Sequence, residues 1–122
     1  MPERRAAIAT LGCRLNQSES ALLEDRIRAA GYALVPFSER ADLGIINTCT
    51  VTGEADAKSR KAIRAFARKN PKAFLAVVGC YAQLEPGAVA RLGGVDLVVG
   101  NREKLDLLDY VRPEKNAQPE IV

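Results

Sequence analysis

The feature that most constrains the fold of this sequence is a regular alternation of short apolar segments with longer amphipathic ones. Strands followed by helices form parallel sheets covered by helices on both faces. The apolar segments are continuous rather than alternating, which is typical of strands buried on both sides. The sequence therefore predicts an α/β fold, a three-layer Rossmann-like or flavodoxin-like domain with a parallel sheet of about five strands. The strands are predicted over Ala6–Leu11, Ala33–Pro36, Leu43–Ile46, Ala73–Val78 and Val95–Val99.

Helices are predicted over about Gln17–Ala30, Glu54–Lys69, Pro86 to the Gly93-Gly94 pair, and Asn101–Val111. In the first helix Asn16 is placed as a cap, with Glu19 completing a capping box. The apolar face of this helix is predicted to contain Leu22, Leu23, Ile27 and Ala30.

Length and composition restrict the class of protein. A chain of 122 residues suits one domain. Its apolar runs are too short to cross a bilayer, so no membrane partner is expected. The start, Met-Pro-Glu-Arg-Arg, lacks the features of a secretory signal, and we expect a cytoplasmic protein. The sequence has no histidine, which removes the commonest general base and mixed Cys/His zinc sites.

The three cysteines occupy equivalent places in the predicted fold. Cys13 follows the first predicted strand, Cys49 the third and Cys80 the fourth. In open α/β sheets ligands bind in the crevice beyond the carboxyl ends of the strands. We therefore expect three thiols, far apart in the sequence, to lie at one edge of the sheet. An odd number of cysteines also suits a reducing compartment, with thiols that are free or bound to metal.

Glycine and polar residues surround these cysteines. Gly12 and Gly79 precede two of them and allow the backbone to approach a bulky ligand. Amide and hydroxyl groups close to sulfur tune a metal cluster through hydrogen bonds. The candidates for this role are Asn16, Asn47, Thr48 and Gln83.

The residues alone leave several interpretations open. Free cysteines often pack as small hydrophobic side chains, which would make this an interaction module with structural thiols. A flavodoxin-like module for small ligands is a second alternative, although no glycine-rich phosphate loop is present. Structural zinc and iron–sulfur clusters usually take four protein ligands. Three thiolates would leave one iron of a four-iron cluster open to a substrate or to exogenous sulfur.

Three cysteine motifs together resemble the amino-terminal domain of the radical-SAM methylthiotransferases. They are Gly12-Cys13-Arg14-Leu15-Asn16, Asn47-Thr48-Cys49 and Gly79-Cys80-Tyr81-Ala82-Gln83. The resemblance extends over residues 1–111, which would form the domain, with residues 112–122 as a linker or disordered tail. It implies that Cys13, Cys49 and Cys80 ligate an auxiliary [4Fe–4S] cluster whose open iron holds the sulfur to be transferred.

The resemblance also implies parts that this sequence does not contain. In such enzymes a second [4Fe–4S] cluster, bound by a C-x-x-x-C-x-x-C motif, cleaves S-adenosylmethionine to a radical. That motif is absent here, as are the radical-SAM and RNA-binding domains. We therefore expect an excised domain that is inactive alone and whose partner is the missing radical-SAM domain.

The segment after Cys49 suggests a substrate. Thr50-Val51-Thr52 is similar to family members that methylthiolate threonylcarbamoyl-adenosine in tRNA. Members acting on isopentenyl-adenosine in tRNA, or on a ribosomal protein, tend to differ there and are the alternatives.

The helix after Cys49 is strongly basic. Lys58, Lys61, Arg64 and Arg68 are the candidates for contact with nucleic acid, whereas Ile63, Phe66 and Ala67 are predicted to face the sheet. A solvated outer surface, a phosphate-binding surface for tRNA and a docking surface for the missing domain all fit this pattern.

Overall fold

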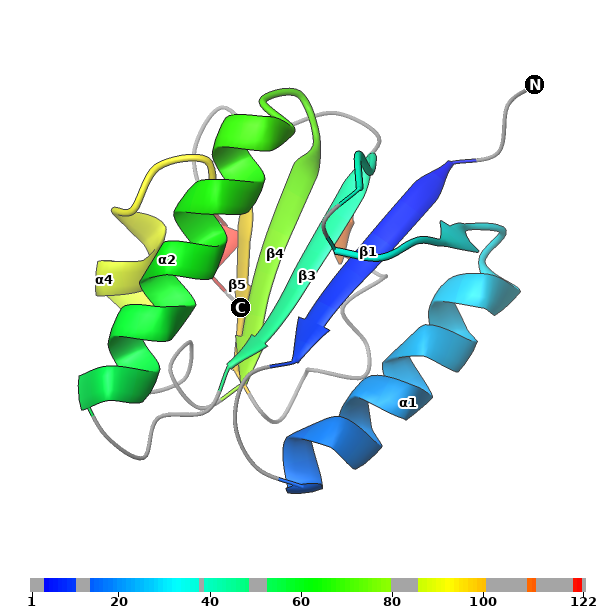
Figure 1. Cartoon of the computed structure of the whole chain (residues 1–122), viewed down its shortest axis with the longest axis horizontal. Coiled ribbons are helices and arrows are strands. Elements are labelled where there is room, and N and C mark those ends of the chain that lie inside the picture. The colour runs from blue at the N-terminus through cyan, green and yellow to red at the C-terminus, as the bar shows by residue number, and fades with distance from the viewer. Residues whose placement is uncertain are drawn as a thin grey trace.

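The computed structural model describes residues 4–10, 14–37, 39–48, 53–79, 86–100, 110–111 and 120–121. Within these ranges a six-stranded sheet, parallel throughout, lies between helices on its two faces (Figure 1). The predicted α/β architecture is confirmed.

The strands follow the order β2-β1-β3-β4-β5-β6 across the sheet. Their bounds are β1 (Arg5–Thr10), β2 (Ala33–Leu34), β3 (Leu43–Thr48), β4 (Phe74–Gly79), β5 (Leu97–Val99) and β6 (Glu120–Ile121). The five predicted strands are present, with ends that differ from the prediction by no more than two residues. β3 and β4 are buried at every position, as expected for strands covered on both faces.

The sixth strand was not predicted. Glu120 and Ile121 pair with Leu97 and Val98 of β5, and the Glu120 backbone N–H donates to the Asp96 carbonyl at 2.9 Å. These residues lie in the segment for which the sequence predicts a linker or tail. A two-residue strand with one charged and one exposed apolar side chain leaves no apolar run for sequence analysis to detect.

Three helices accompany the strands in the described part of the chain: α1 (Arg14–Ala29), α2 (Gly53–Lys69) and α4 (Pro86–Ala90). α1 begins three residues before the prediction, so Asn16 lies inside the helix and its assignment as the cap is wrong. Arg14 and Leu15 are good helix formers, which allows the helix to extend beyond the capping signal. The helix predicted from Asn101 lies outside the described residues except for Tyr110 and Val111.

The two faces of the sheet carry separate apolar clusters. α2 and α4 cover one face, where Ile63, Phe66 and Val89 pack with Ile46 and other strand residues. α1 covers the opposite face through Leu23 and Ile27, which pack with Ile45 and Phe74. Ile45 and Ile46 point to opposite faces because side chains alternate along a strand.

The predicted apolar face of α1 is therefore only half correct. Leu23 and Ile27 are fully buried, but Leu22 is 52% exposed and Ala30 is exposed as well. Leu23 and Ile27 supply the buried contact of α1 with the sheet, where the helix lies against β1, β2 and β3.

Aspartates hold the amino ends of the strands. Asp42 precedes β3, and its carboxylate accepts from the Arg5 backbone N–H at 2.9 Å. Asp96 precedes β5, and its carboxylate accepts from the Leu75 backbone N–H at 2.9 Å. Each aspartate therefore joins the start of its own strand to a neighbouring strand, which helps to set the register of the β1–β3 and β4–β5 pairs.

Phe66 of α2 packs directly on the glycine of β3. A Cβ atom at Gly44 would lie 2.7 Å from Phe66 Cε2 and closer still to other atoms of that ring. The Phe66 ring also stacks on Phe37, with ring centroids 5.2 Å apart. The absence of a side chain at position 44 thus sets how closely α2 approaches the sheet.

We expect Gly44→Ala to lower the free energy of unfolding by about 1–3 kcal/mol, because the added methyl group displaces the Phe66 ring from a packed core. Gly87→Ala is the matched control, since a Cβ there meets only the end of the Arg91 side chain at 3.4 Å. Urea unfolding of both variants checks the prediction. Equal stabilities would contradict it.

Candidate metal centre at the carboxyl edge of the sheet

Three neighbouring strands end at one level of the sheet. The register places Thr10 of β1 opposite Asn47 of β3, and Thr48 of β3 opposite Gly79 of β4. In Figure 1 these strands end together at the bottom, where α1 and α2 begin. Adjacent strands lie about 4.8 Å apart, so the three strand ends span about 10 Å.

The cysteines follow these strand ends in the sequence. Cys13 comes three residues after the end of β1, and Cys49 and Cys80 come directly after β3 and β4. All three lie outside the described residues, so their predicted gathering remains a prediction. The described part of the chain establishes the frame, which is three adjacent strand ends in register.

A buried hydrogen-bonded cluster ties the ends of β1 and β3 to α1. The Ser20 hydroxyl of α1 lies 2.6 Å from the Thr10 hydroxyl of β1. The Asn47 side-chain amide donates to the same Ser20 oxygen at 3.0 Å. Ser20 and Asn47 are almost completely buried. Because buried polar groups are costly to leave without partners, this cluster fixes the positions of the three elements relative to one another.

The ends of β3 and β4 are joined in a different way. The Thr48 hydroxyl donates to the Val78 carbonyl at 2.7 Å. Gly79 has a φ of +100°, which favours glycine over other residues. A Cβ atom at this position would lie 2.9 Å from both Asn47 Oδ1 and the Thr48 backbone nitrogen. The residue before Cys80 is therefore glycine for two reasons, its backbone angle and its packing against β3.

The structure describes the side chains of two of the four predicted polar residues, Asn47 and Thr48. Asn47 and Thr48 meet at the end of β3, and the hydrogen bonds described above direct them to Ser20 and Val78. Their predicted role beside sulfur stays a prediction. The Asn16 side chain and Gln83 lie outside the described residues.

Sequence analysis missed Thr10 and Ser20. A signal for Ser20 is nevertheless present, because residues 20, 23 and 27 follow the spacing of one helical face. A serine on the same stripe as the buried Leu23 and Ile27 indicates a buried hydroxyl that needs a partner.

The basic residues of α2 lie away from the strand ends. Lys58, Lys61, Arg64 and Arg68 are all exposed, and Ile63 and Phe66 are buried against the sheet, as predicted. Ala67 is partly buried and packs against the same apolar cluster.

Comparison with known proteins identifies the family. The model of a family described as "Uncharacterized protein family UPF0004" matches residues 5–100, which is most of the chain. The chain belongs to this family. The matched range contains all three cysteines and five of the six strands.

Several named proteins are similar to this UPF0004 chain over most of its length. The threonylcarbamoyladenosine tRNA methylthiotransferase MtaB of Aquifex aeolicus is 49% identical over 104 residues, which is 85% of this chain and 25% of that protein. The Bacillus subtilis protein of the same name is 42% identical, over 86% of this chain and 23% of its own length. The ribosomal protein uS12 methylthiotransferase RimO of a Roseiflexus species is 33% identical, over 85% of this chain and 22% of that protein.

These matches confirm the resemblance to methylthiotransferases. The chain spans about a quarter of the length of the relatives it matches. No helix in the described ranges is both long enough and apolar enough to cross a membrane.

We expect Gly79→Ala to destabilise the chain more than Gly31→Ala. Both glycines have a φ near +100°, but a Cβ at Gly31 meets no atom within 4 Å. Gly31→Ala therefore measures the backbone cost alone, about 1–2 kcal/mol. Gly79→Ala adds the clash with Asn47 and Thr48, about 1–3 kcal/mol more. Urea unfolding provides the comparison, and equal losses would show that the contact at the strand ends is unimportant.

Proposed function

We propose that this chain is the auxiliary cluster domain of a methylthiotransferase that modifies threonylcarbamoyl-adenosine in tRNA. Cys13, Cys49 and Cys80 are the proposed ligands of a [4Fe–4S] cluster. The observation that carries the proposal is the register of β1, β3 and β4, whose level carboxyl ends precede the three cysteines of the chain.

The metal-binding side chains of the sequence suit an iron–sulfur cluster. Iron–sulfur clusters are held by cysteine thiolates, and the chain offers three thiols and no histidine. Cys49 and Cys80 are each one peptide, about 3.8 Å between Cα atoms, from strand ends that pair with each other. A cluster held by these three thiolates would leave one iron without a protein ligand, and this iron would be open to the sulfur that is transferred.

The residues of the chain itself supply rigidity at this edge. Ser20, Thr10 and Asn47 lock β1, β3 and α1 together, and Gly79 allows β4 to end tightly against β3. Metal ligands bind best when their positions are set by packing before the metal arrives. Asn47 and Thr48 occupy the last two positions of β3, so they are also the proposed polar neighbours of the cluster.

The remaining chemistry belongs to parts of the enzyme outside this sequence. The C-x-x-x-C-x-x-C motif is not in the chain, so the second cluster and the binding of S-adenosylmethionine are assigned to a radical-SAM domain. We propose residues 1–111 as the cluster domain and a cytoplasmic location, where tRNA is modified. We expect no methylthiotransferase activity from this chain alone.

The substrate assignment is supported by the relatives. The two proteins named for threonylcarbamoyladenosine are 49% and 42% identical to this chain. A ribosomal protein methylthiotransferase is 33% identical, and a synthase of 2-methylthio-dimethylallyladenosine from Clostridium novyi is 28% identical. We therefore propose threonylcarbamoyl-adenosine as the substrate. Isopentenyl-adenosine in tRNA and a ribosomal protein are the alternatives.

Anaerobic reconstitution with iron and sulfide tests the cluster assignment. We expect about four irons and four sulfides per chain, and loss of the cluster in each of Cys13→Ala, Cys49→Ala and Cys80→Ala. Iron and sulfide analysis, with circular dichroism to show that each variant is folded, makes the measurement.

A double variant tests whether cluster binding depends on the positions of the thiols or only on their number. Cys49→Ala combined with Ala65→Cys keeps three cysteines but moves one to an exposed site on α2, about 18 Å along the helix from its first residue. We expect this variant to remain without a cluster. A folded wild-type chain that binds no iron, or a double variant that binds a full complement, would contradict the proposal.

A further inference from the structure

The positive charge of this protein is concentrated in one segment. Residues 57–72 contain seven bases and no acid. The rest of the chain has eleven bases and fifteen acids, so its net charge is −4, although the whole chain carries +3. The net charge of the whole chain is therefore small, although residues 57–72 are strongly basic and the rest of the chain is acidic.

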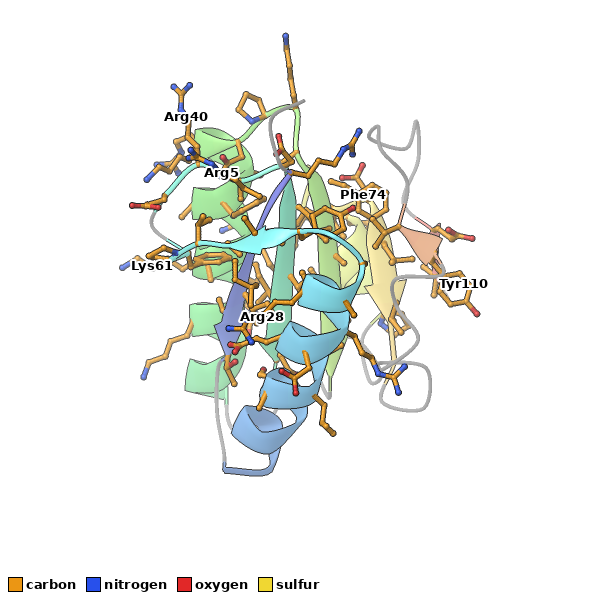
Figure 2. All side chains as sticks on the ribbon, turned by 90° about the vertical axis from the view of Figure 1, so that its right-hand side faces the viewer. Arg5, Arg28, Arg40, Lys61, Phe74 and Tyr110 are labelled. Carbon is orange, nitrogen blue, oxygen red and sulfur yellow. The ribbon has the colours of Figure 1, made fainter. Side chains whose placement is uncertain are left out.

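Most of these bases lie on the outer surface of α2. We call Lys58, Lys61, Arg64 and Arg68 the basic face. All four side chains are exposed, and Ile63 and Phe66 on the other side of the helix are buried against the sheet. Figure 2 shows Lys61 on the outer side of α2, directed away from the sheet. The spacing of three, three and four residues places the four bases in one row along the helix.

The bases within this row do not stabilise one another. Like charges three or four residues apart repel one another on a helix surface. None of the four bases forms an ion pair with an acid in the described part of the chain, where Arg28 pairs with Asp25 on α1. No acid in the described residues therefore offsets the repulsion among these bases. A negatively charged partner that bound along the row would offset it.

The basic face leads away from the proposed cluster site. α2 begins at Gly53, five residues after the end of β3. At about 1.5 Å per residue, Lys58 lies about 8 Å and Arg68 about 22 Å from the first residue of the helix. The row therefore extends for about 15 Å from near the carboxyl edge toward the amino edge of the sheet.

α1 on the opposite face differs in charge pattern. It contains three bases, Arg14, Arg26 and Arg28, and three acids, Glu19, Glu24 and Asp25. From Ala57 onward α2 contains no acid, whereas the bases Arg26 and Arg28 of α1 lie beside the acids Glu24 and Asp25. A linear polyanion matches such a row, whereas protein surfaces normally intersperse charges of both signs.

We propose that the basic face binds the phosphate backbone of the RNA substrate. The RNA lies along α2, and its path continues to the carboxyl edge, where the modified nucleotide meets the cluster site. This inference rests on the proposed function for the identity of the RNA. The contact itself is electrostatic, and it requires neither iron nor S-adenosylmethionine.

Charge reversal on the two helices tests the proposal. The 122-residue chain is titrated against a fluorescently labelled tRNA transcript at several salt concentrations, and binding is followed by anisotropy. The test variant is Lys61→Glu with Arg64→Glu on α2. The matched control is Arg26→Glu with Arg28→Glu on α1, which changes the net charge by the same amount on the opposite face of the sheet.

We expect the wild-type chain to bind tRNA in a salt-sensitive manner. The α2 variant should bind on the order of tenfold more weakly, with a salt slope shallower by about 2, and the α1 control should stay close to wild type. Thermal unfolding shows whether each variant is folded. A second α2 pair, Lys58→Gln with Arg68→Gln, should weaken binding in the same direction without introducing acids.

Several results would overturn the proposal. They are a wild-type chain without salt-sensitive tRNA binding, an α2 variant that binds as tightly as wild type, and equal losses in both variants. Retained tRNA binding by the α2 variant, together with weaker association with a separately produced radical-SAM domain, would assign the basic face to a protein partner instead. The iron content of the reconstituted chain is measured in parallel. A chain without iron would count against the proposed cluster, whereas the tRNA titration would still test the basic face.

Discussion

The parallel register of β1, β3 and β4 is the constraint on which the candidate centre depends. At the amino ends the Asp42 carboxylate joins β3 to β1. At the carboxyl ends the cluster of Thr10, Ser20 and Asn47 joins β1 to β3, and the Thr48 hydroxyl joins β3 to β4. A slip of one residue would exchange the side chains packed on the two faces and would remove Gly44 from its place beneath the Phe66 ring. Side-chain packing on both faces therefore keeps the ends of the three strands in register. These strand ends are where the segments that contain the cysteines begin.

Much of this arrangement could be predicted because burial leaves a simple pattern. β3 and β4 are continuous apolar runs, so their burial on both faces of a parallel sheet follows from the sequence, and with it the edge at which the strands before Cys49 and Cys80 end. The missed features depend on tertiary context. β6 consists of two residues that become a strand only beside β5, and Ser20 acquires its role only when α1 places it between Thr10 and Asn47. The capping signal at Asn16 failed because good helix formers precede it.

In the described residues, the carboxyl edge of the sheet and the basic face of α2 differ in charge. Uncharged side chains and a glycine hold the carboxyl edge, where the proposed ligands begin, whereas the positive charge lies on the outer surface of α2. Cationic side chains beside a cluster would alter its electronic properties, and Lys61, Arg64 and Arg68 lie about 12 Å or more along α2 from its first residue. Substitutions on the basic face should consequently change RNA binding without changing the cluster.

The proposed centre has three protein thiolates as ligands and one iron without a protein ligand. Mössbauer spectra of the ⁵⁷Fe-reconstituted chain, recorded before and after the addition of a small thiolate, distinguish this ligand set from a fully ligated cluster. We predict that about one iron in four changes its spectrum and that the other three keep theirs. A spectrum that is unchanged by the added thiolate would show that no iron is open and would rule out the proposed centre.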